Sequence, residues 1–527
     1  GKYLYFTYVY KGNITARGYM KGSQATELYR AIILQYGEWA EKRTGECAFC
    51  GKALKNGLKR RKSVMCKKKG FDSAGDIPDK FVNDVKDEKP MEKSNMRRKR
   101  VVAAVCALAL ISLGIIVLIA GIGNQDSGPV LDVIYPKAYA FDDVDTRITI
   151  MEQNPVDDSF LKALDDFSYK TGALVLVDKG ENINYSPLSL YYALSVAATG
   201  AGSDTRDQLL ALLGVSDPQV LTEQCGNFYR RVYRDNKIGK LIIANSIWLD
   251  DDMNGEPVLF KESFVKSAAE IFYASCHSVD FSAKETGKAM ADWVSANTNG
   301  TLSPTIETDP EQILSILNTV YFYDQWIDRF NKSKTAKDTF YLSNGDEVEV
   351  DFMNKTNPST GFSRGEGFTR SGMSLKNGNH MAFILPDEGV SPYDLLASPD
   401  RMKETFEGGE SFCGEVVWKI PKFSFGSRLA LTDALESLGV TSAFLPDADF
   451  SGITDHMAYI TGVLQETHIA IDEDGVEASA FTQINYAGSA LPEGRAEMIL
   501  DRPFIYYITA SDGSMLFVGV CENPAGQ

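Results

Sequence analysis

The chain has 527 residues, of which 44% are hydrophobic and 11% aromatic; this length suggests more than one unit, and this composition excludes a disordered protein. Its net charge of -17 is unevenly distributed, because residues 1–100 contain 24 Lys and Arg against 11 Asp and Glu, whereas residues 124–527 contain 30 against 60. The asymmetry predicts different compartments or partners for the two parts, and the acidic part argues against a nucleic-acid ligand.

The first 100 residues form a basic segment with three cysteines. Cys47 and Cys50 form a Cys-x-x-Cys pair that, with Cys66, resembles a zinc ribbon. The pattern is incomplete, because tetrahedral zinc needs four ligands and Lys69 stands where the fourth thiolate would lie. A zinc site and a basic, solvated cytoplasmic segment both remain open, and we assign no metal and no cofactor.

Residues Val101 to Gly123 are 23 consecutive residues without a charge. At about 1.5 Å per helical residue this run can cross a bilayer core of about 30 Å. Four basic residues, 97–100, precede it, so the positive-inside bias predicts a single-pass cell-membrane protein with a cytoplasmic N-terminus and an extracellular acidic part. The alternative is a signal peptide cleaved after Ala138-Tyr139-Ala140, which would give a secreted form.

We treat residues 124–150 as a linker and residues 151–527 as one folded domain, in which helical and strand patterns mix as in an α+β fold. Helices are predicted at residues 154–171, 186–194 and 429–438, and strands at residues 240–249, 313–322, 381–385, 415–420, 504–508 and 515–520. The four cysteines of this domain are too scattered for a disulfide framework.

A hydrolase is the obvious rival interpretation. Gly361-Phe362-Ser363-Arg364-Gly365 matches the G-x-S-x-G nucleophile elbow, but the flanking residues predict a loop and not the strand-to-helix turn that an elbow requires. None of the four histidines has a metal-ligand spacing or a plausible Cys partner. We therefore predict that the protein is not an enzyme.

Residues 475–489 combine two patterns that rarely coincide. Alternate residues from Val476 to Gly488 are mostly apolar or small, as in a strand with one buried face, with Phe481 and Ala487 as exceptions to the alternation. Glycines and Pro492 mark the same region as an exposed loop. An ordinary edge strand fits the pattern, and so does a loop that enters a sheet later.

The last part of the chain resembles the serpin family of serine protease inhibitors, in the form of a membrane-anchored, bacterial-type member. The resemblance extends over about 370 residues, and the membrane segment lies outside it. It rests on blocks in the family's order, which are residues 186–189, 241–249, 279–281, 293–300, 318–330, 421–423, 438–440, 449–453, 469–482, 501–504 and 516–524. The resemblance implies a large mixed central sheet, surrounding helices and an exposed reactive-centre loop.

In serpins a protease cuts this loop and is trapped as an acyl-enzyme when the freed hinge enters the central sheet as a new strand. By resemblance, the hinge comprises Gly475, Val476, Glu477, Ala478, Ser479 and Ala480. Counting from Gly475 as the family does places the reactive bond at Ser489-Ala490, with Tyr486 and Ala487 as rival positions. The small residues there suit an elastase-like or subtilisin-like protease and lack the Lys or Arg that a trypsin-like pocket requires.

The resemblance also marks two places where the sheet would open. Ser186, Ser189, Asn318 and Gln465 match the shutter, with Gln465 in place of the usual His, and Trp326 and Glu473 match the breach. An amide does not titrate, so gating at Gln465 is expected to depend less on pH. Partners are expected to be serine proteases and the membrane. The alternative is a non-inhibitory serpin that acts as a binding or chaperone module.

Overall fold

The computed structural model describes residues 3–10, 13–21, 128–177, 180–476 and 494–526. The chain divides into two units, Gly1–Ile122 and Gly123–Gln527. In the first unit, β1 (Tyr3–Tyr10) pairs antiparallel with β2 (Asn13–Lys21). The sequence analysis did not predict this hairpin, although aromatic and β-branched residues, which favour strands, dominate β1.

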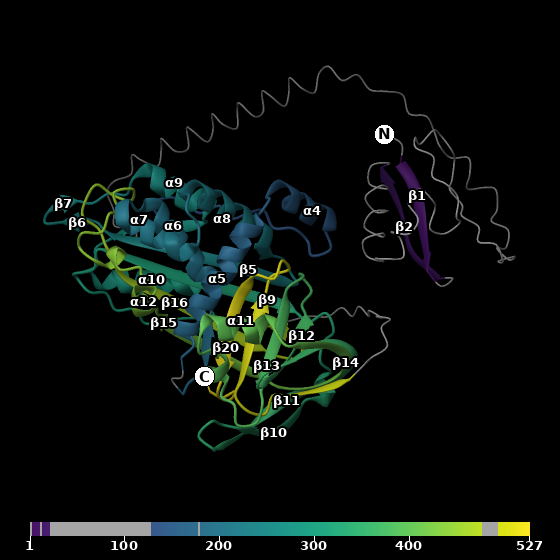
Figure 1. The fold of residues 1–527 in the computed structure, drawn as a ribbon. Helices are drawn as coiled ribbons and strands as arrows, with labels where there is room; N and C mark the ends of the chain where they lie inside the picture. The colour runs from purple at the N-terminus through teal and green to yellow at the C-terminus, as the bar shows by residue number, and fades with distance from the viewer. Residues whose placement is uncertain (1–2, 11–12, 22–127, 178–179, 477–493, 527) are drawn as a thin grey trace, which may run out of the picture. The chain divides into compact units, whose positions relative to one another are not determined.

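Two sheets form the framework of the second unit (Figure 1). In the central sheet the strand order is β15 (Phe423–Ala430), β16 (Ile460–Ile471), β17 (Gly475–Val476), β9 (Leu314–Gln325), β5 (Gly239–Asp250) and β4 (Arg234–Asp235), and β8 (Ala274–Val279) also pairs with β5. The second sheet has the order β18 (Arg495–Ile499), β14 (Glu410–Pro421), β11 (Glu347–Gly365), β12 (Phe368–Ser374), β13 (His380–Pro386), β19 (Phe504–Thr509), β20 (Met515–Cys521) and β3 (Ile183–Tyr185), and β10 (Ala336–Tyr341) pairs with β11. A small ribbon joins β6 (Asp252–Met253) to β7 (Glu256–Pro257).

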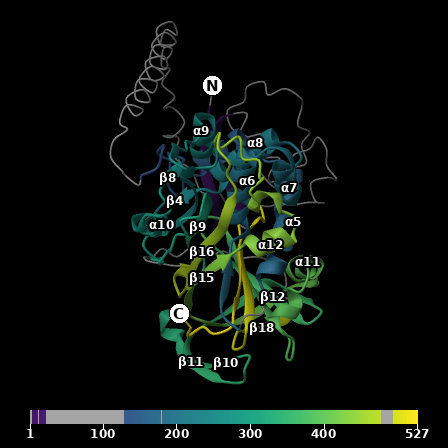
Figure 2. The ribbon, with the colours of Figure 1, turned by 90° about the vertical axis from the view of Figure 1, so that its left-hand side faces the viewer.

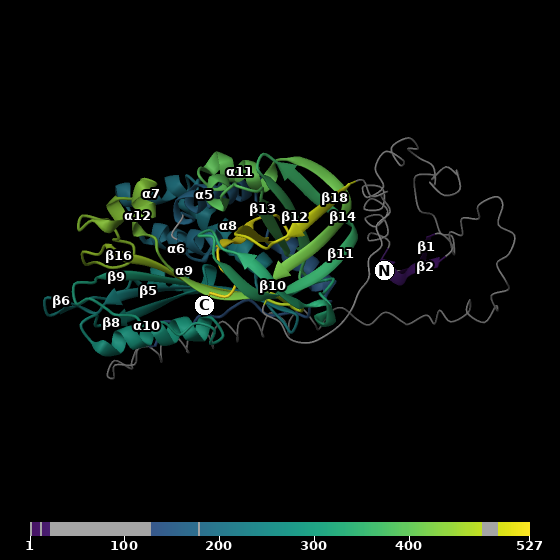
Figure 3. The same ribbon diagram turned by 90° about the horizontal axis from the view of Figure 1, so that it is seen from below.

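Helices cover both faces of the central sheet. The helices of the described residues are α4 (Val144–Gln153), α5 (Asp158–Val175), α6 (Pro187–Gly200), α7 (Ser203–Leu213), α8 (Pro218–Val232), α9 (Glu262–Ile271), α10 (Lys284–Asn297), α11 (Pro399–Glu407) and α12 (Thr432–Ser437), with 3-10 turns at Lys332–Lys334, Pro392–Leu395 and Ser442–Phe444. Figure 3 shows α10 on one side of β5 and β9, and α6 and α7 on the other. Because both faces are covered, β5 and β9 are almost continuously buried.

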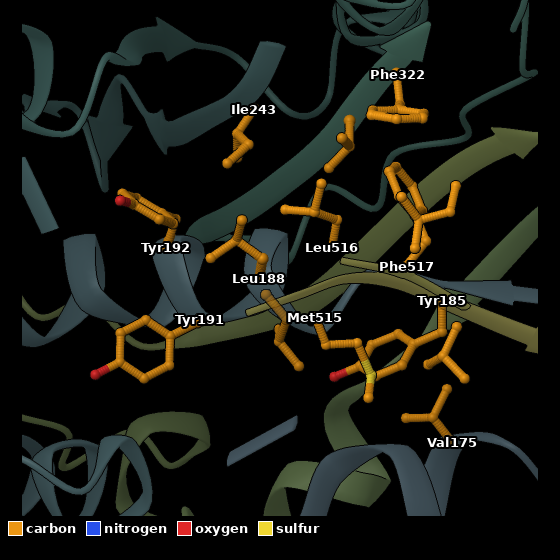
Figure 4. Packing of buried hydrophobic residues seen from close by; sticks show 14 of the residues in the cluster. Val175, Tyr185, Leu188, Tyr191, Tyr192, Ile243, Phe322, Met515, Leu516 and Phe517 are labelled. Carbon is orange, nitrogen blue, oxygen red and sulfur yellow. The ribbon is translucent and has the colours of Figure 1, made fainter. Parts of the chain in front are cut away.

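The main core lies between the central sheet, α6 and β20. Ser186 caps α6 by accepting a hydrogen bond from the backbone N–H of Ser189, and Pro187 occupies the first turn, where its missing N–H costs nothing. Figure 4 shows the side chains of α6 and β20 gathered beside Ile243 and Phe322 of the central strands. On the other face, Trp248 and Leu317 pack in a second cluster with residues of α10.

The main elements lie close to where the sequence places them, with three differences. The helix expected at residues 429–438 is shorter, because residues 429 and 430 belong to β15 and pair with β16. The loop expected at residues 361–365 is instead the end of β11, paired with β12 and β14. The segment treated as a linker, residues 124–150, contains most of α4, and its Val130 N–H donates to Cys276 O of β8 at 2.7 Å.

Candidate functional site

The central sheet is closed at one end and opens at the other. Strands β9 and β16 pair directly and in parallel up to the Val320–Thr467 pair. Beyond that pair they diverge, and β17 lies between them, antiparallel to both. Figure 2 shows β9, β16 and β15 side by side. The place where β17 enters is therefore a gap between two strands that a longer strand could occupy.

The two hinge residues that the structure describes already lie in this gap. Gly475 is opposite Gln325 and Val476 is opposite Asp324. A Cβ atom at Gly475 would lie 2.3 Å from the carbonyl oxygen of Asp324, so no larger residue fits without moving the strand. Val476 is 1% exposed and belongs to the main core. Glu477, Ala478, Ser479 and Ala480 lie outside the described residues, as do Ser489 and Ala490 of the expected reactive bond.

The four predicted shutter residues meet at the closed end of the sheet. The Gln465 side chain donates from Nε2 to Ser186 O and to Asn318 Oδ1, both at 2.9 Å, and its Oε1 accepts from Ser186 N at 2.9 Å. Asn318 Nδ2 donates to Ser189 O at 2.9 Å and to Asn245 Oδ1 at 2.6 Å. All of these side chains are neutral and buried. The network therefore joins α6 to three neighbouring strands without any charge.

Two buried polar atoms of this network, Ser189 Oγ and Asn245 Nδ2, have no hydrogen-bond partner among the described residues. The Ser189 hydroxyl is fully buried and has no hydrogen-bond partner among the described residues. A buried hydroxyl without a partner loses the hydrogen bonds that water would supply, which costs about 1–3 kcal/mol. Ser189 therefore offers a free polar atom beside the strands that would separate if the sheet opened.

The predicted breach residues lie at the open end. Trp326 follows β9 directly and is fully buried; its Nε1 donates to Asp472 O at 3.0 Å, and its backbone N–H donates to Asp474 O at 3.2 Å. Phe330 N–H donates to Glu473 O at 3.1 Å. These bonds attach the turn before the hinge, residues 472–474, to the chain that leaves β9.

Charged contacts reinforce this attachment. Glu473 accepts a hydrogen bond from Thr335 at 2.7 Å and forms an ion pair with Lys422 at 3.0 Å. Burial alone would raise the pKa of Glu473, but the hydrogen bonds from Thr335 and Lys422 outweigh it and hold the pKa below its ordinary value. Asp474 forms ion pairs with Arg329 at 3.0 Å and Lys332 at 2.7 Å. The open end therefore holds ionised groups, unlike the shutter.

Two residues at the open end were missed from the sequence. Arg329 holds Asp474, and Asp324 is a fully buried carboxylate one residue from the end of β9. For Asp324 the sequence did contain a signal. An acidic residue is unusual directly after a buried apolar run such as Ile313 to Phe322, and this could have marked Asp324 as a buried charge.

Ser363 does not have the geometry of a nucleophile elbow. It lies within β11 and is followed by β12, not by a helix. Its Oγ is 3.2 Å from Ser411 Oγ and accepts from Arg370 Nη2 at 3.4 Å. The sequence analysis argued against catalysis at Ser363 because the strand-to-helix turn of an elbow was not expected there, and the structure has no such turn at this position. It predicted a loop, however, and the segment is a strand.

Several other expectations fall on residues that the structure does not describe. In the described part of the chain, no helix is both long and apolar enough for a membrane span, and Val101 to Gly123 lie outside that part. The same holds for Cys47, Cys50 and Cys66. The described cysteines, which are Cys225, Cys276, Cys413 and Cys521, form no disulfide with one another.

Comparisons with known proteins agree with this geometry. The sequence profile of the family described as Serpin (serine protease inhibitor) matches residues 162–524. Serpin-Z1B of Triticum aestivum is 30% identical over 366 residues, which cover 65% of this chain and 90% of the wheat protein.

Solved structures agree as well. The thermophilic serpin tengpin in its native state is 26% identical, with a TM-score of 0.63 over 75% of this chain and 97% of tengpin. Arabidopsis AtSerpin1 in its native stressed conformation is 25% identical, with a TM-score of 0.60 over 71% of this chain and all of that one. The protein belongs to the serpin family.

Proposed function

We propose that the protein is a suicide-substrate inhibitor of serine proteases that traps its target as a covalent acyl-enzyme by inserting residues 477–489 into the central sheet. Members of this family are generally inhibitors and not enzymes. The observation that carries the proposal is β17, because Gly475 and Val476 already occupy the gap between β9 and β16. A cut loop could continue from there as one added strand.

The register of β17 on β9 predicts where the rest of the loop would lie. Val476 is opposite Asp324, and each further residue of the loop moves one residue back along β9 because the strands are antiparallel. Ala480 then comes opposite Val320, the last residue of β9 that now pairs with β16. Thr482 comes opposite Asn318. Insertion of Ala480 and of the residues after it therefore requires β9 and β16 to separate.

The register of β17 on β16 gives the same answer independently. Val476 is opposite Ile471, so Thr482 comes opposite Gln465. Gln465 and Asn318 are themselves paired now and joined by a hydrogen bond of 2.9 Å. Thr482 would thus enter between them, on the same face as Val476, and its hydroxyl would lie on the side of Ser189, whose own hydroxyl has no partner among the described residues.

The inward-facing residues of the loop suit burial. On the face of Val476 lie residues 478, 480, 482 and 484, which are Ala, Ala, Thr and Ile. None carries a charge, so their burial leaves no charge without a partner. Residues 477, 479, 481 and 483, which are Glu, Ser, Phe and Gln, would lie on the opposite face, where Phe481 is the one apolar residue among these four. This pattern supports an inhibitory loop. It supports less well a binding module, whose hinge would resist insertion.

The specificity and the location of the inhibitor are part of the proposal. Ser489-Ala490 as the reactive bond, with small residues on both sides, favours elastase-like or subtilisin-like targets with shallow primary pockets. The uncharged run from Val101 to Gly123 and the basic residues before it support single-pass anchorage in the cell membrane with the serpin domain extracellular.

A gel assay with two matched variants tests the mechanism. The full chain incubated with elastase or subtilisin is expected to give a complex that survives boiling in detergent. Ala480→Glu places a carboxylate on the inward face and should convert the inhibitor into a cleaved substrate. Ser479→Glu adds the same charge one residue earlier on the outward face and should leave most of the complex intact.

The outcomes separate the interpretations. Cleavage without any complex in the unmodified chain would contradict inhibition and favour the binding or chaperone module. Equal effects of the two glutamates would contradict the register given above. A Ser489→Arg variant that gains no inhibition of trypsin would contradict the assignment of the reactive bond.

A further inference from the structure

Asp324 is a carboxylate buried where the hinge meets the sheet. It is 0% exposed and lies between two neighbours, Val476 of β17 on one side and Gly239 of β5 on the other. Its backbone oxygen is the atom that a Cβ at Gly475 would strike. Any movement of β9 that admits more of the loop therefore moves Asp324 as well.

The carboxylate is held by amide groups. Asp324 Oδ1 accepts from Asn377 Nδ2 and from Gln325 N, and Oδ2 accepts from Asn379 Nδ2, all at 2.9 Å. Asn377 N–H lies 3.2–3.3 Å from both oxygens. Residues 377 and 379 belong to the turn between β12 and β13. Amides satisfy the oxygens, but they carry no net charge to compensate the buried one.

The same turn is fixed from a third direction. Asn377 Oδ1 accepts from Asn236 Nδ2 at 3.1 Å, and Asn236 Oδ1 accepts from the backbone N–H groups of Ile238 and Gly239, both at 2.9 Å. Asp324 therefore connects β9, the turn from β4 to β5 and the turn of the second sheet. These contacts must shift if β9 slides relative to its neighbours.

The first cation near Asp324 is Arg234 of β4. Its Nη1 donates to the carbonyl oxygens of Arg231 and Tyr233, both at 2.7 Å, so it binds backbone groups. Burial lowers the pKa of Arg234; the charges of Tyr139, Asp324 and Asp512 oppose this shift, and that of Arg147 adds to it. Arg234 interacts with Asp324 without pairing with it.

The second cation is Lys376, on the turn. Its Nζ donates to Gln325 Oε1 at 3.0 Å. Burial, followed by Arg329, lowers the pKa of Lys376, and the charges of Asp324 and Asp474 oppose this shift. With both cations directed elsewhere, burial raises the pKa of Asp324 to about 6, even though its amide partners act in the opposite direction.

We propose that Asp324 is a positioning residue for loop insertion, and that its ionised form makes the central sheet easier to open than its protonated form. This inference rests on the proposed inhibitory function and names a control of it. In the closed sheet, no cation among the described residues forms an ion pair with the ionised carboxylate of Asp324. Opening admits water, which solvates the charge, whereas a protonated carboxyl gains less from water.

The size and direction of the effect follow from linkage. If opening returns the pKa of Asp324 from about 6 to the ordinary 3.8, the opening equilibrium is more favourable well above pH 6 than well below pH 4 by at most about 160-fold, of which about 60-fold falls between pH 4 and pH 8. Most of this change falls between pH 4 and 6, about tenfold remains between pH 5 and pH 8, and a partial hydration gives a smaller factor. Insertion should therefore be faster at neutral pH than in mild acid.

Peptide annealing to the full chain measures the effect. The probe is a synthetic peptide with the sequence of residues 478–489 and blocked ends, which has no group that titrates between pH 5 and 8. Its insertion is followed by native electrophoresis and by the gain in melting temperature. In the unmodified chain the rate should rise several-fold, by at most about tenfold, from pH 5 to pH 8, and in Asp324→Asn it should stay near the acid value throughout.

Asp165→Asn is the matched control. Burial, with the charge of Glu407, also raises the pKa of Asp165 to about 6, but Asp165 lies on α5. This variant should keep the pH profile of the unmodified chain. Urea unfolding provides a second readout, because Asp324→Asn should gain stability over the unmodified chain at pH 8 and not at pH 4.

Two results would overturn the inference in distinguishable ways. Annealing with the same pH profile in Asp324→Asn as in the unmodified chain would exclude Asp324 as the control while leaving the inhibitory function standing. A complete failure of the unmodified chain to anneal the peptide at any pH, together with no complex in the gel assay, would remove the insertion mechanism and the control with it.

Discussion

The two ends of the gap between β9 and β16 are held together by different chemistry. At the closed end, the shutter residues Ser186, Asn318 and Gln465 form a buried network of neutral amide and hydroxyl groups. At the open end, Glu473 and Asp474 form ion pairs with three basic residues. Neutral networks keep their strength across pH, whereas ion pairs depend on ionisation. In the proposed mechanism the closed end separates after the open end. The contacts that hold this closed end together are therefore the ones whose strength depends least on pH.

The largest expected effect is at the open end. Trp326→Ala removes a fully buried aromatic ring that contacts Phe330 at a centroid distance of 6.2 Å and holds Asp472 O. The free energy of unfolding should fall by about 3–5 kcal/mol, because the cavity cannot collapse fully within a sheet. Urea unfolding measures it. Trp293→Ala on α10, where the ring is only partly buried, should cost less, and an equal cost would contradict the central packing role of Trp326.

A smaller effect is expected at the closed end. Gln465→Leu keeps the volume but leaves Ser186 N–H and Asn318 Oδ1 without their partner. The loss should be about 2–3 kcal/mol, since two buried polar groups lose hydrogen bonds. Because Gln465 does not titrate, the loss should be constant from pH 5 to pH 8. Gln208→Leu, which removes partly exposed bonds to Ser442, is the control and should cost under about 1 kcal/mol.

The smallest effect is that of Glu473→Gln, which weakens the ion pair with Lys422. Since the folded-state pKa of Glu473 lies below the ordinary 4.5, the ionised group stabilises the fold above that pH, and this contribution is lost as pH falls through the folded pKa. We expect a loss of about 1 kcal/mol at pH 7 that disappears in acid. Glu349→Gln, in an exposed pair with Lys337, should show no loss at either pH. A loss for Glu473→Gln that is equal at both pH values would contradict the role of its charge.

The sequence predicts best those parts of the fold whose causes are local. Helix α6 begins where Ser186 and Pro187 predict it, and β5 and β9 occupy the apolar runs at residues 240–249 and 313–322. The end of β11 was missed because its sequence, rich in Asn, Pro, Ser and Gly, has low strand propensity, and pairing with β12 and with the distant β14 stabilises it. The start of α12 was misplaced for the same reason, since β15 depends on β16.

The site follows the same division. The resemblance named Gln465, Asn318 and Ser186 one by one, and the structure brings them into a single network. It could not show that Asp324 is buried against the turn of the second sheet, because residues 324 and 377 meet only through the packing of two sheets. Burial, and with it the direction of a pKa shift, is a property of the folded chain and cannot be obtained from spacing along it.

The placement of Gly475 and Val476 bears on speed. Starting a strand is slow because several residues lose conformational freedom before any hydrogen bond repays the loss, whereas lengthening an existing strand is fast. Here Gly475 and Val476 are already paired with β9, and Val476 is also paired with β16. In the proposed mechanism a cleaved loop would not need to nucleate a new strand and would only extend an existing one. Fast extension favours inhibition, because insertion must be completed before the acyl bond is hydrolysed and the protease is released.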